Sequence, residues 1–187
     1  MKLEHPMAWT TIESGFTGSD GTRLFYRAWK PAVLPATRPP RALIFLHRGH
    51  EHSGRIAPLV QRFGMQGDWA FAYDARGHGH SPGERGDAPD FATLVDDLDR
   101  FAQHVATTYG IAPQDTIVVA NSVGAVVAAT WVHDYAPAIR GLIMAAAAFS
   151  IKLYVPLAKP ALRFARRFKP DLFVTSYIRP GMLTHSK

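Results

Sequence analysis

The sequence of 187 residues contains no cysteine. Disulfide scaffolds, thiolate zinc sites, iron–sulfur clusters and a cysteine nucleophile are therefore excluded as explanations of its function. Long apolar runs are also lacking, because the most apolar stretch, residues 142–150, is far shorter than the roughly 20 residues of a membrane-spanning helix. The first ten residues carry charged side chains and no apolar centre of a secretory signal, so we expect a cytoplasmic protein.

Acidic residues are scarce at the C-terminal end of the chain. Residues 150–187 hold eight lysines and arginines but one acid, Asp171, whereas the preceding part is nearly neutral. Basic charge confined to one end, without a recognisable nucleic-acid-binding module, does not indicate nucleic-acid binding. Residues 159–169 predict a basic amphipathic helix. This helix is interpreted either as a lid that contacts an anionic membrane surface or as a cap helix whose basic face is solvated.

The first 150 residues alternate between short apolar runs and helical periodicity, in a chain that is 47% hydrophobic and 19% charged. We predict strands at residues 11–16, 24–29, 42–46, 69–73, 116–120 and 142–146, and helices at 56–66, 91–109 and 123–133. An antiparallel pair followed by alternating strands and helices predicts an α/β fold with a mostly parallel sheet and flanking helices. The alternation stops near residue 148.

A serine lies where the strand at 116–120 meets the helix at 123–133, in the sequence Ala120-Asn121-Ser122-Val123-Gly124. A serine hydroxyl stands exposed above a sheet when a sharp strand–turn–helix carries it, and small neighbours permit such a turn. The backbone N–H of Val123 then lies at the start of a helix, where negative charge is favoured. The alternative interpretation is a serine that merely caps the helix.

A loop rich in histidine, residues 47–55, follows the strand at 42–46. Such a loop can present backbone N–H groups to a developing oxyanion, and Gly49 is the expected donor because glycine permits close approach. The competing hypothesis is a metal site, since His47, His50 and His52 have H-x-x-H-x-H spacing.

A glycine-rich loop, residues 74–86, follows the strand at 69–73. We interpret it as a structural loop in which Asp74 and Arg76 pair with each other. The sequence contains no phosphate-binding loop and no dinucleotide fingerprint.

In this order the three segments resemble the α/β-hydrolase fold, and more narrowly the monoacylglycerol lipase, lysophospholipase and serine aminopeptidase-like group. That group is marked by an H-G-x-G-E-H-S-G-R loop, a D-x-R-G-H-G-x-S-x-G loop and G-x-S-x-G. The resemblance covers residues 11–150. It implies that Ser122 is the catalytic nucleophile and that Gly49 and Val123 are the oxyanion-hole donors.

The chain departs from the group's pattern at three glycines. Arg48 and His50 replace the two glycines of H-G-x-G, and Ala120 replaces the first glycine of G-x-S-x-G. Alanine is nearly as small as glycine, so the turn is still expected. Arg48 beside the oxyanion loop is expected to alter access or the charge of the substrate.

The acid and base that would activate the serine are not evident. In this fold they follow the nucleophile, yet beyond Ser122 the chain holds only the acids Asp134 and Asp171 and the histidines His133 and His185. His133 and Asp134 lie roughly 16 Å along the helix that starts at Ser122. Asp171 lies in a basic, proline-rich segment, which leaves His185 as a candidate base.

The resemblance implies further strands beyond a lid, which carry the acid and the base. We therefore expect a C-terminally truncated hydrolase, with residues 1–150 as the N-terminal part of the core and 151–187 as a partial lid. A truncated sheet is expected to expose an apolar edge and to make the isolated chain aggregate or depend on a partner.

The resemblance implies a serine hydrolase acting on carboxylic esters with a hydrophobic acyl chain, with monoacylglycerols and lysophospholipids as candidate substrates. Because the acid and the base are not assignable in this chain, we expect the fragment itself to be inactive. We expect no cofactor and no metal. The expected partners are a small acyl ester or lipid, a membrane surface contacted through 159–169, and a downstream domain in a longer parent chain. Two alternatives stay open: a non-catalytic, degenerate domain that binds an acyl ligand or a partner protein, and an amide or peptide hydrolase.

Overall fold

The computed structural model describes residues 9–63, 67–149, 164–165 and 167–168. The chain divides into two units, Met1–Phe149 and Ser150–Lys187. In the second unit the described residues are helical, and Phe164 and Phe168 are exposed. Most of the predicted basic helix, together with Asp171 and His185, lies outside the described residues.

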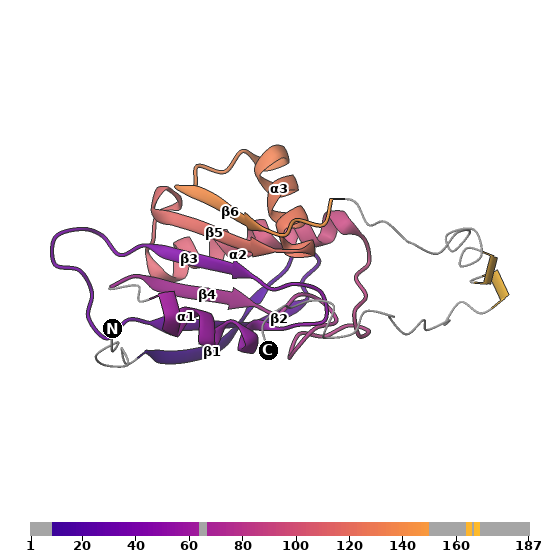
Figure 1. Cartoon of the computed structure of the whole chain (residues 1–187), viewed down its shortest axis with the longest axis horizontal. Helices are drawn as coiled ribbons and strands as arrows, with labels where there is room; N and C mark the ends of the chain where they lie inside the picture. Colours follow the sequence, from indigo (N-terminus) through magenta and orange to yellow (C-terminus); the bar gives the residue numbers. More distant parts are fainter. Residues whose placement is uncertain (1–8, 64–66, 150–163, 166, 169–187) are drawn as a thin grey trace, which may run out of the picture. The chain divides into compact units, whose positions relative to one another are not determined.

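The first unit is built on a sheet of six described strands in the order β1-β2-β4-β3-β5-β6 (Figure 1). The strands are β1 (Thr10–Thr17), β2 (Arg23–Lys30), β3 (Ala42–Leu46), β4 (Trp69–Tyr73), β5 (Thr116–Asn121) and β6 (Gly141–Ala145). β2 pairs antiparallel with both β1 and β4, whereas β3, β4, β5 and β6 run parallel to one another. The sheet is therefore mixed and mostly parallel, as predicted.

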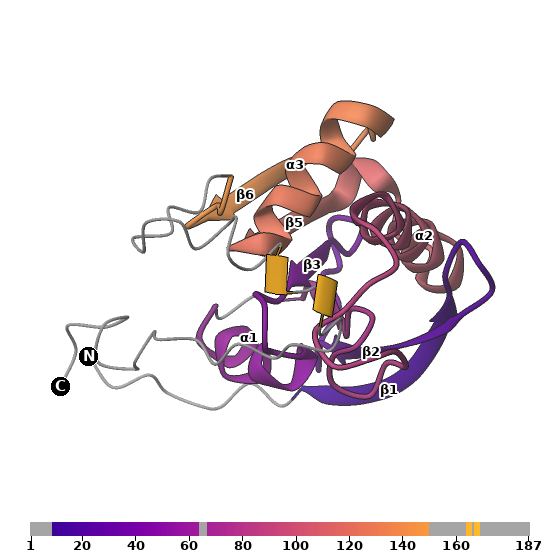
Figure 2. The same cartoon turned by 90° about the vertical axis from the view of Figure 1, so that its right-hand side faces the viewer.

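Helices cover both faces of this sheet. α1 (Ala57–Phe63) lies on one face, and α2 (Phe91–Tyr109) and α3 (Val123–Tyr135) lie on the other (Figure 2). The chain passes from β3 to β4 on one side and then back past β3 to β5 on the other. Because such crossovers are right-handed, this reversal sends α1 and α2 to opposite faces. It also makes the carboxyl ends of β3 and β5 a topological switch point, where α/β proteins bind ligands.

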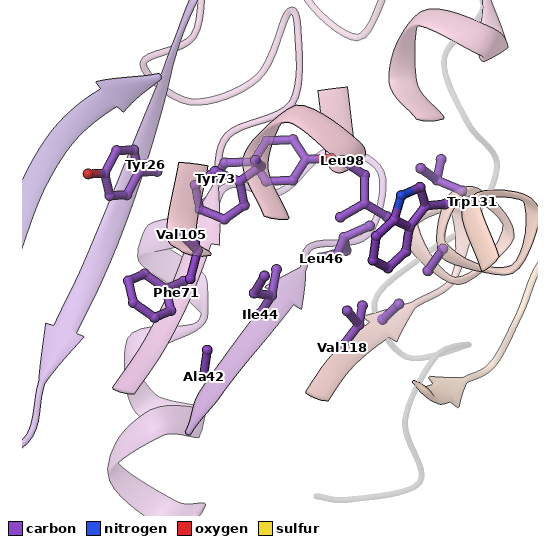
Figure 3. Close-up of a cluster of buried hydrophobic side chains, with 14 of the residues drawn as sticks. Tyr26, Ala42, Ile44, Leu46, Phe71, Tyr73, Leu98, Val105, Val118 and Trp131 are labelled. Atoms are coloured by element: carbon purple, nitrogen blue, oxygen red, sulfur yellow. The ribbon is translucent and has the colours of Figure 1, made fainter. Parts of the chain in front are cut away.

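Two apolar clusters hold the layers together, because successive side chains of a strand point to opposite faces. Ile44, Leu46 and Val118 face α2 and α3, where they pack with Leu98 and Trp131 (Figure 3). The alternate residues of β3 and β4, which are Leu43, Phe45, Ala70 and Ala72, face α1. They pack with Val60 of α1 and with Ile56, which directly precedes it. The strands are buried on both faces, which explains their nearly continuous apolar sequence.

The observed elements confirm the predicted strands and helices with small shifts at the ends. The largest difference is in the helix predicted at 56–66: a 3-10 turn at Ser53–Arg55 precedes the α-helix Ala57–Phe63, and residues 64–66 lie outside the described residues. The helix at 91–109 has the predicted ends because Asp90 accepts a hydrogen bond from the Thr93 N–H at its start and Gly110 is left-handed at its end.

β6 forms one edge of the described sheet and carries exposed apolar side chains. Ile143 is 52% exposed and Met144 is 46% exposed. This is the apolar edge expected from the sequence, whereas truncation of the chain stays a prediction. None of the helices in the described part of the chain is long and apolar enough to span a membrane.

Candidate active site

Ser122 occupies a sharp turn between the end of β5 and the first residue of α3. Its backbone has φ 56° and ψ −120°, a conformation that costs a residue with a side chain about 1–3 kcal/mol. The turn is held by the Ser122 N–H, which donates to the Ala145 carbonyl at the end of β6. The Ser122 hydroxyl makes no capping hydrogen bond to α3, so the capping interpretation is wrong. The geometry is that of a serine raised above the carboxyl edge of a sheet.

Gly124 allows α3 to start directly against β3. A Cβ atom at this position would lie 2.8 Å from the His47 carbonyl oxygen and 2.9 Å from the Leu46 Cβ atom. These distances are too short for any larger residue without a backbone shift. The second glycine of the G-x-S-x-G pattern is therefore required for close packing between helix and strand.

The two predicted oxyanion donors lie side by side. A Cβ atom built on Gly49 would contact the Val123 Cγ1 atom at 3.9 Å. Within the described residues, neither the Gly49 N–H nor the Val123 N–H is hydrogen-bonded to another group of the chain. Val123 is the first residue of α3, so its N–H also lies at the positive end of the helix dipole. The structure thus brings Ser122, Gly49 and Val123 together.

The ring of His47 joins the histidine-rich loop to the glycine-rich loop. Its Nε2 atom accepts from the Ala75 N–H at 3.0 Å, and its Nδ1 atom lies 2.8 Å from the Arg48 carbonyl oxygen, to which it donates. Acceptance at Nε2 requires the neutral ring with its proton on Nδ1. Burial lowers the pKa of His47 and favours that neutral form. Sequence reasoning treated His47 only as a metal ligand and missed this structural role.

The metal-site hypothesis finds no support in the geometry of the loop. The His47 ring is occupied by backbone groups, and the His52 ring accepts from the Gly54 N–H. Across the described ranges, no group of three or more histidine, aspartate or glutamate side chains is arranged to hold a metal ion.

Asp74 and Arg76 do not pair with each other, which corrects the interpretation made from the sequence. The buried Asp74 carboxylate accepts from the Ser53 N–H at 2.5 Å and from the His80 N–H at 2.8 Å. It therefore links the histidine-rich loop to the glycine-rich loop, as His47 does. A Cβ atom on Gly79 would lie 2.0 Å from this carboxylate, so a glycine is required there.

Arg76 instead holds the glycine-rich loop to two distant elements. Its guanidinium bonds Asp97 of α2 through Nε at 2.7 Å and Asp20 of the β1–β2 turn through Nη1 at 2.6 Å. These carboxylates raise the pKa of Arg76. Burial raises the pKa of Asp97, which is fully buried, whereas the Arg76 hydrogen bond lowers the pKa of the exposed Asp20. The opposite directions follow from the different burial of the two carboxyls.

The two residues that replace loop glycines have distinct environments. Arg48 forms an ion pair with Glu51 at 2.8 Å, so its charge beside the oxyanion loop is partly balanced. His50 is exposed and has φ 62°, the left-handed conformation that glycine adopts without strain. The loop keeps a glycine-like backbone at this position although its side chain is large.

No described residue supplies the serine with a base. His133 and Asp134 pair with each other at 2.6 Å on the last turn of α3, where both are exposed. Among the residues that the structure describes, no side chain is hydrogen-bonded to the Ser122 hydroxyl. His185 lies outside the described residues, so its assignment as base stays a prediction.

Comparison with known proteins links this geometry to a family. The family described as serine aminopeptidase, S33 (Hydrolase_4), matches residues 37–187. The uncharacterized protein YnbC of Escherichia coli (strain K12) is 48% identical over 175 residues, which cover 94% of this chain and 29% of that protein. The monoacylglycerol lipase of Mycolicibacterium smegmatis is 36% identical over 121 residues, covering 62% of this chain and 39% of the lipase. The chain spans less than half of the length of either relative.

Solved structures show the same fold at low sequence identity. The α/β-hydrolase GrgF from Penicillium matches with a TM-score of 0.66 and 18% identity, over 92% of this chain and 60% of that one. A carboxyl esterase from Bacillus coagulans matches with a TM-score of 0.61 and 20% identity, over 86% of this chain and 51% of the esterase. The chain therefore belongs to the serine aminopeptidase S33 family, it has the α/β-hydrolase fold, and over part of its length it is similar to monoglyceride lipases.

Proposed function

We propose that this chain provides the nucleophile and the oxyanion hole of a serine hydrolase acting on carboxylic esters with a hydrophobic acyl chain. One observation carries the proposal: Ser122 stands on a strained turn beside the unpartnered N–H groups of Gly49 and Val123. The Ser122 Oγ atom would attack the ester carbonyl carbon, and the two N–H groups would stabilise the negative charge that develops on the carbonyl oxygen. The monoacylglycerol lipase and monoglyceride lipase relatives support monoacylglycerols as the substrate class. Lysophospholipids are a second candidate class, which rests on the resemblance seen in the sequence.

The test is a reaction of the full 187-residue chain with a fluorophosphonate probe, read by intact mass. Labelling would form a bond between the Ser122 Oγ atom and phosphorus while fluoride leaves, and the Ser122→Ala variant should remain unlabelled. Labelling would also mean that a base such as His185 activates Ser122 within this chain, against the expected truncation. Thr130→Ala, on the same helix but away from the turn, is the matched control and should label as the parent does. Labelling that survives in Ser122→Ala would overturn the assignment of the nucleophile.

A second candidate function is a non-catalytic domain that binds an acyl ligand or a partner protein. The observation that favours it is the Ser122 hydroxyl, which has no hydrogen-bonded base among the described residues. A folded chain that binds acyl ligands but is never labelled by the fluorophosphonate would support this function and reject hydrolysis by this chain. An amide or peptide hydrolase would be indicated if labelled protein cleaved aminoacyl amides faster than acyl esters.

A further inference from the structure

Two polar side chains flank the candidate oxyanion donor Gly49 at positions where the H-G-x-G pattern has glycine. Arg48 precedes Gly49 and His50 follows it. The Glu51 N–H donates to the Arg48 carbonyl oxygen at 3.3 Å and closes a turn with Gly49 and His50 at its centre. Because consecutive Cα atoms are only about 3.8 Å apart, both side chains start directly beside the donor.

The Arg48 guanidinium is held at one nitrogen and open at the other two. Its Nε atom contacts the Glu51 Oε1 atom at 2.8 Å, and the Arg48 side chain is 49% exposed. Among the described residues no other hydrogen bond or ion pair engages this guanidinium. Its two Nη groups therefore form a free fork that matches two oxygens of an anion. Since Glu51 already orients the side chain, less conformational entropy is lost when an anion binds.

His50 supplies a further donor on the same side of the site. It lines a cavity that Gly49 and Val123 also line. Its ring is exposed, and within the described part of the chain it makes no hydrogen bond. An imidazole ring carries at least one N–H in either charge state, so this side chain can donate to an anion at neutral pH. The left-handed backbone that holds it, with φ 62°, is uncommon for a residue with a side chain.

The glycine-rich loop gives the opposite side of the same cavity a different charge. Arg76 lines the cavity, but its guanidinium is engaged by Asp97 and Asp20. Asp87 also lines the cavity, is exposed, and has no ion-pair partner in the described ranges. A negatively charged group is therefore repelled by the glycine-rich loop and finds open donors on the histidine-rich loop.

We propose that Arg48 and His50 bind a phosphate group of the substrate, so that the preferred substrates are carboxylic esters whose alcohol part carries a phosphate monoester. The proposal rests on the proposed ester hydrolysis. A carbonyl oxygen held by the Gly49 and Val123 N–H groups places the alcohol part of the ester close to the residues that flank Gly49. A phosphate has three oxygens and close to two negative charges at neutral pH, so it can accept from the Arg48 fork and the His50 ring together.

The experiment measures binding to the full chain carrying Ser122→Ala, so that phosphate recognition and hydrolysis can fail separately. Titration calorimetry compares hexanoylglycerol with hexanoylglycerol phosphate, which differ only in the phosphate, and inorganic phosphate is titrated alone. We expect the phosphate ester to bind about tenfold more tightly than the neutral ester. Added salt should reduce this preference, because the donors are exposed. Inorganic phosphate should bind more weakly than the phosphate ester, because it lacks the ester group.

Variants of the two flanking residues test which groups bind the phosphate. Arg48→Gln should bring the affinities of the two esters close together, and His50→Gly should reduce the preference by a smaller factor. Glycine adopts the left-handed backbone without strain, so His50→Gly is not expected to unfold the turn. Arg55→Gln is the matched control, because Arg55 is an exposed arginine of the same loop that does not line the cavity. Circular dichroism of each variant checks that it is folded.

A preference for the phosphate ester that falls in Arg48→Gln and His50→Gly but persists in Arg55→Gln would support the proposal. Equal affinity for the two esters, an equal loss in Arg55→Gln, inorganic phosphate that binds as tightly as the phosphate ester, or no binding at all would overturn it. If Ser122 is labelled by the fluorophosphonate while the phosphate preference is absent, the hydrolase function stands and phosphate recognition falls. If the preference is found while labelling fails, phosphate recognition stands and the hydrolase function falls.

Discussion

Single residues at the candidate site are constrained by backbone contacts rather than by side-chain chemistry. Gly124 is the clearest case, because the atom that a Cβ would meet first is the His47 carbonyl oxygen, which belongs to the loop of the oxyanion donor. We expect Gly124→Ala to lower the free energy of unfolding by about 1–3 kcal/mol through overpacking. Urea unfolding followed by fluorescence measures the change.

The control for this substitution is Gly141→Ala, because among the described residues no atom beyond its chain neighbours lies within 4 Å of the position where its Cβ would stand. It should change the free energy of unfolding by less than about 0.5 kcal/mol. Equal effects at the two glycines would contradict the close approach of α3 and β3.

His47 should make the protein less stable in acid. Burial lowers its pKa in the folded protein, so the unfolded chain takes up the proton first as the pH falls below about 6.5. The stability that the neutral ring contributes is present above that pH and is lost as the pH falls toward the folded-state pKa. We expect the free energy of unfolding to be smaller at pH 5.5 than at pH 7.5.

The variant His47→Gln isolates this effect, because an amide can replace the donor and acceptor without titrating. Its free energy of unfolding should depend less on pH than that of the parent chain. His104, whose pKa burial also lowers, remains in both proteins and accounts for part of the residual slope. A slope unchanged by the variant would show that His47 does not titrate as described.

At the scale of elements, Arg76 ties the glycine-rich loop to α2 and to the β1–β2 turn. Asp97 is fully buried, so its loss leaves the guanidinium without its main partner. We expect Asp97→Asn to destabilise the protein by about 3–5 kcal/mol, as measured by thermal or urea unfolding.

Asp20→Asn is the matched comparison, since the Asp20 side chain is exposed to solvent and contacts the same guanidinium. Its effect should be clearly smaller, because water replaces an exposed partner and salt screens the pair. The interpretation fails if the two substitutions destabilise the protein equally.

Strands and helices were predictable from the sequence where the residues that mark them are adjacent in the chain. The buried strands are short apolar runs bounded by loops, and the long helix has a cap at Asp90 and a left-handed Gly110. The elbow at Ser122 was predictable because its small neighbours are adjacent in sequence. The contact between Asp74 and Ser53 and the partners of Arg76 were not, because those residues lie 21 to 56 positions away, and no local pattern reports which acid faces a given arginine.

At the scale of the whole first unit, the two edges of the described sheet differ. β1 is rich in polar and exposed residues, whereas β6 exposes Ile143 and Met144. We expect the full chain to self-associate with rising concentration, and we expect Ile143→Lys to reduce this association because an edge lysine disfavours pairing with another strand. Light scattering after size-exclusion chromatography measures both.

Ser14→Lys provides a lysine at an exposed position of the opposite edge strand β1 as a control and should leave association unchanged. A parent chain that stays monomeric at all concentrations would contradict the prediction that its β6 edge promotes self-association.

The strand order also has a consequence for how the protein emerges from the ribosome. β3 lies at the centre of the described sheet, and β4 and β5 are synthesised after it and join it on opposite sides. Synthesis therefore makes the β1–β2 edge and β3 first, places β4 between β2 and β3, and then adds β5 and finally β6 on the other side of β3. At about 5–20 residues per second, a nascent chain presents the bare flank of β5 for seconds before β6 arrives. During that interval the unpaired edge of β5 is available to bind a chaperone.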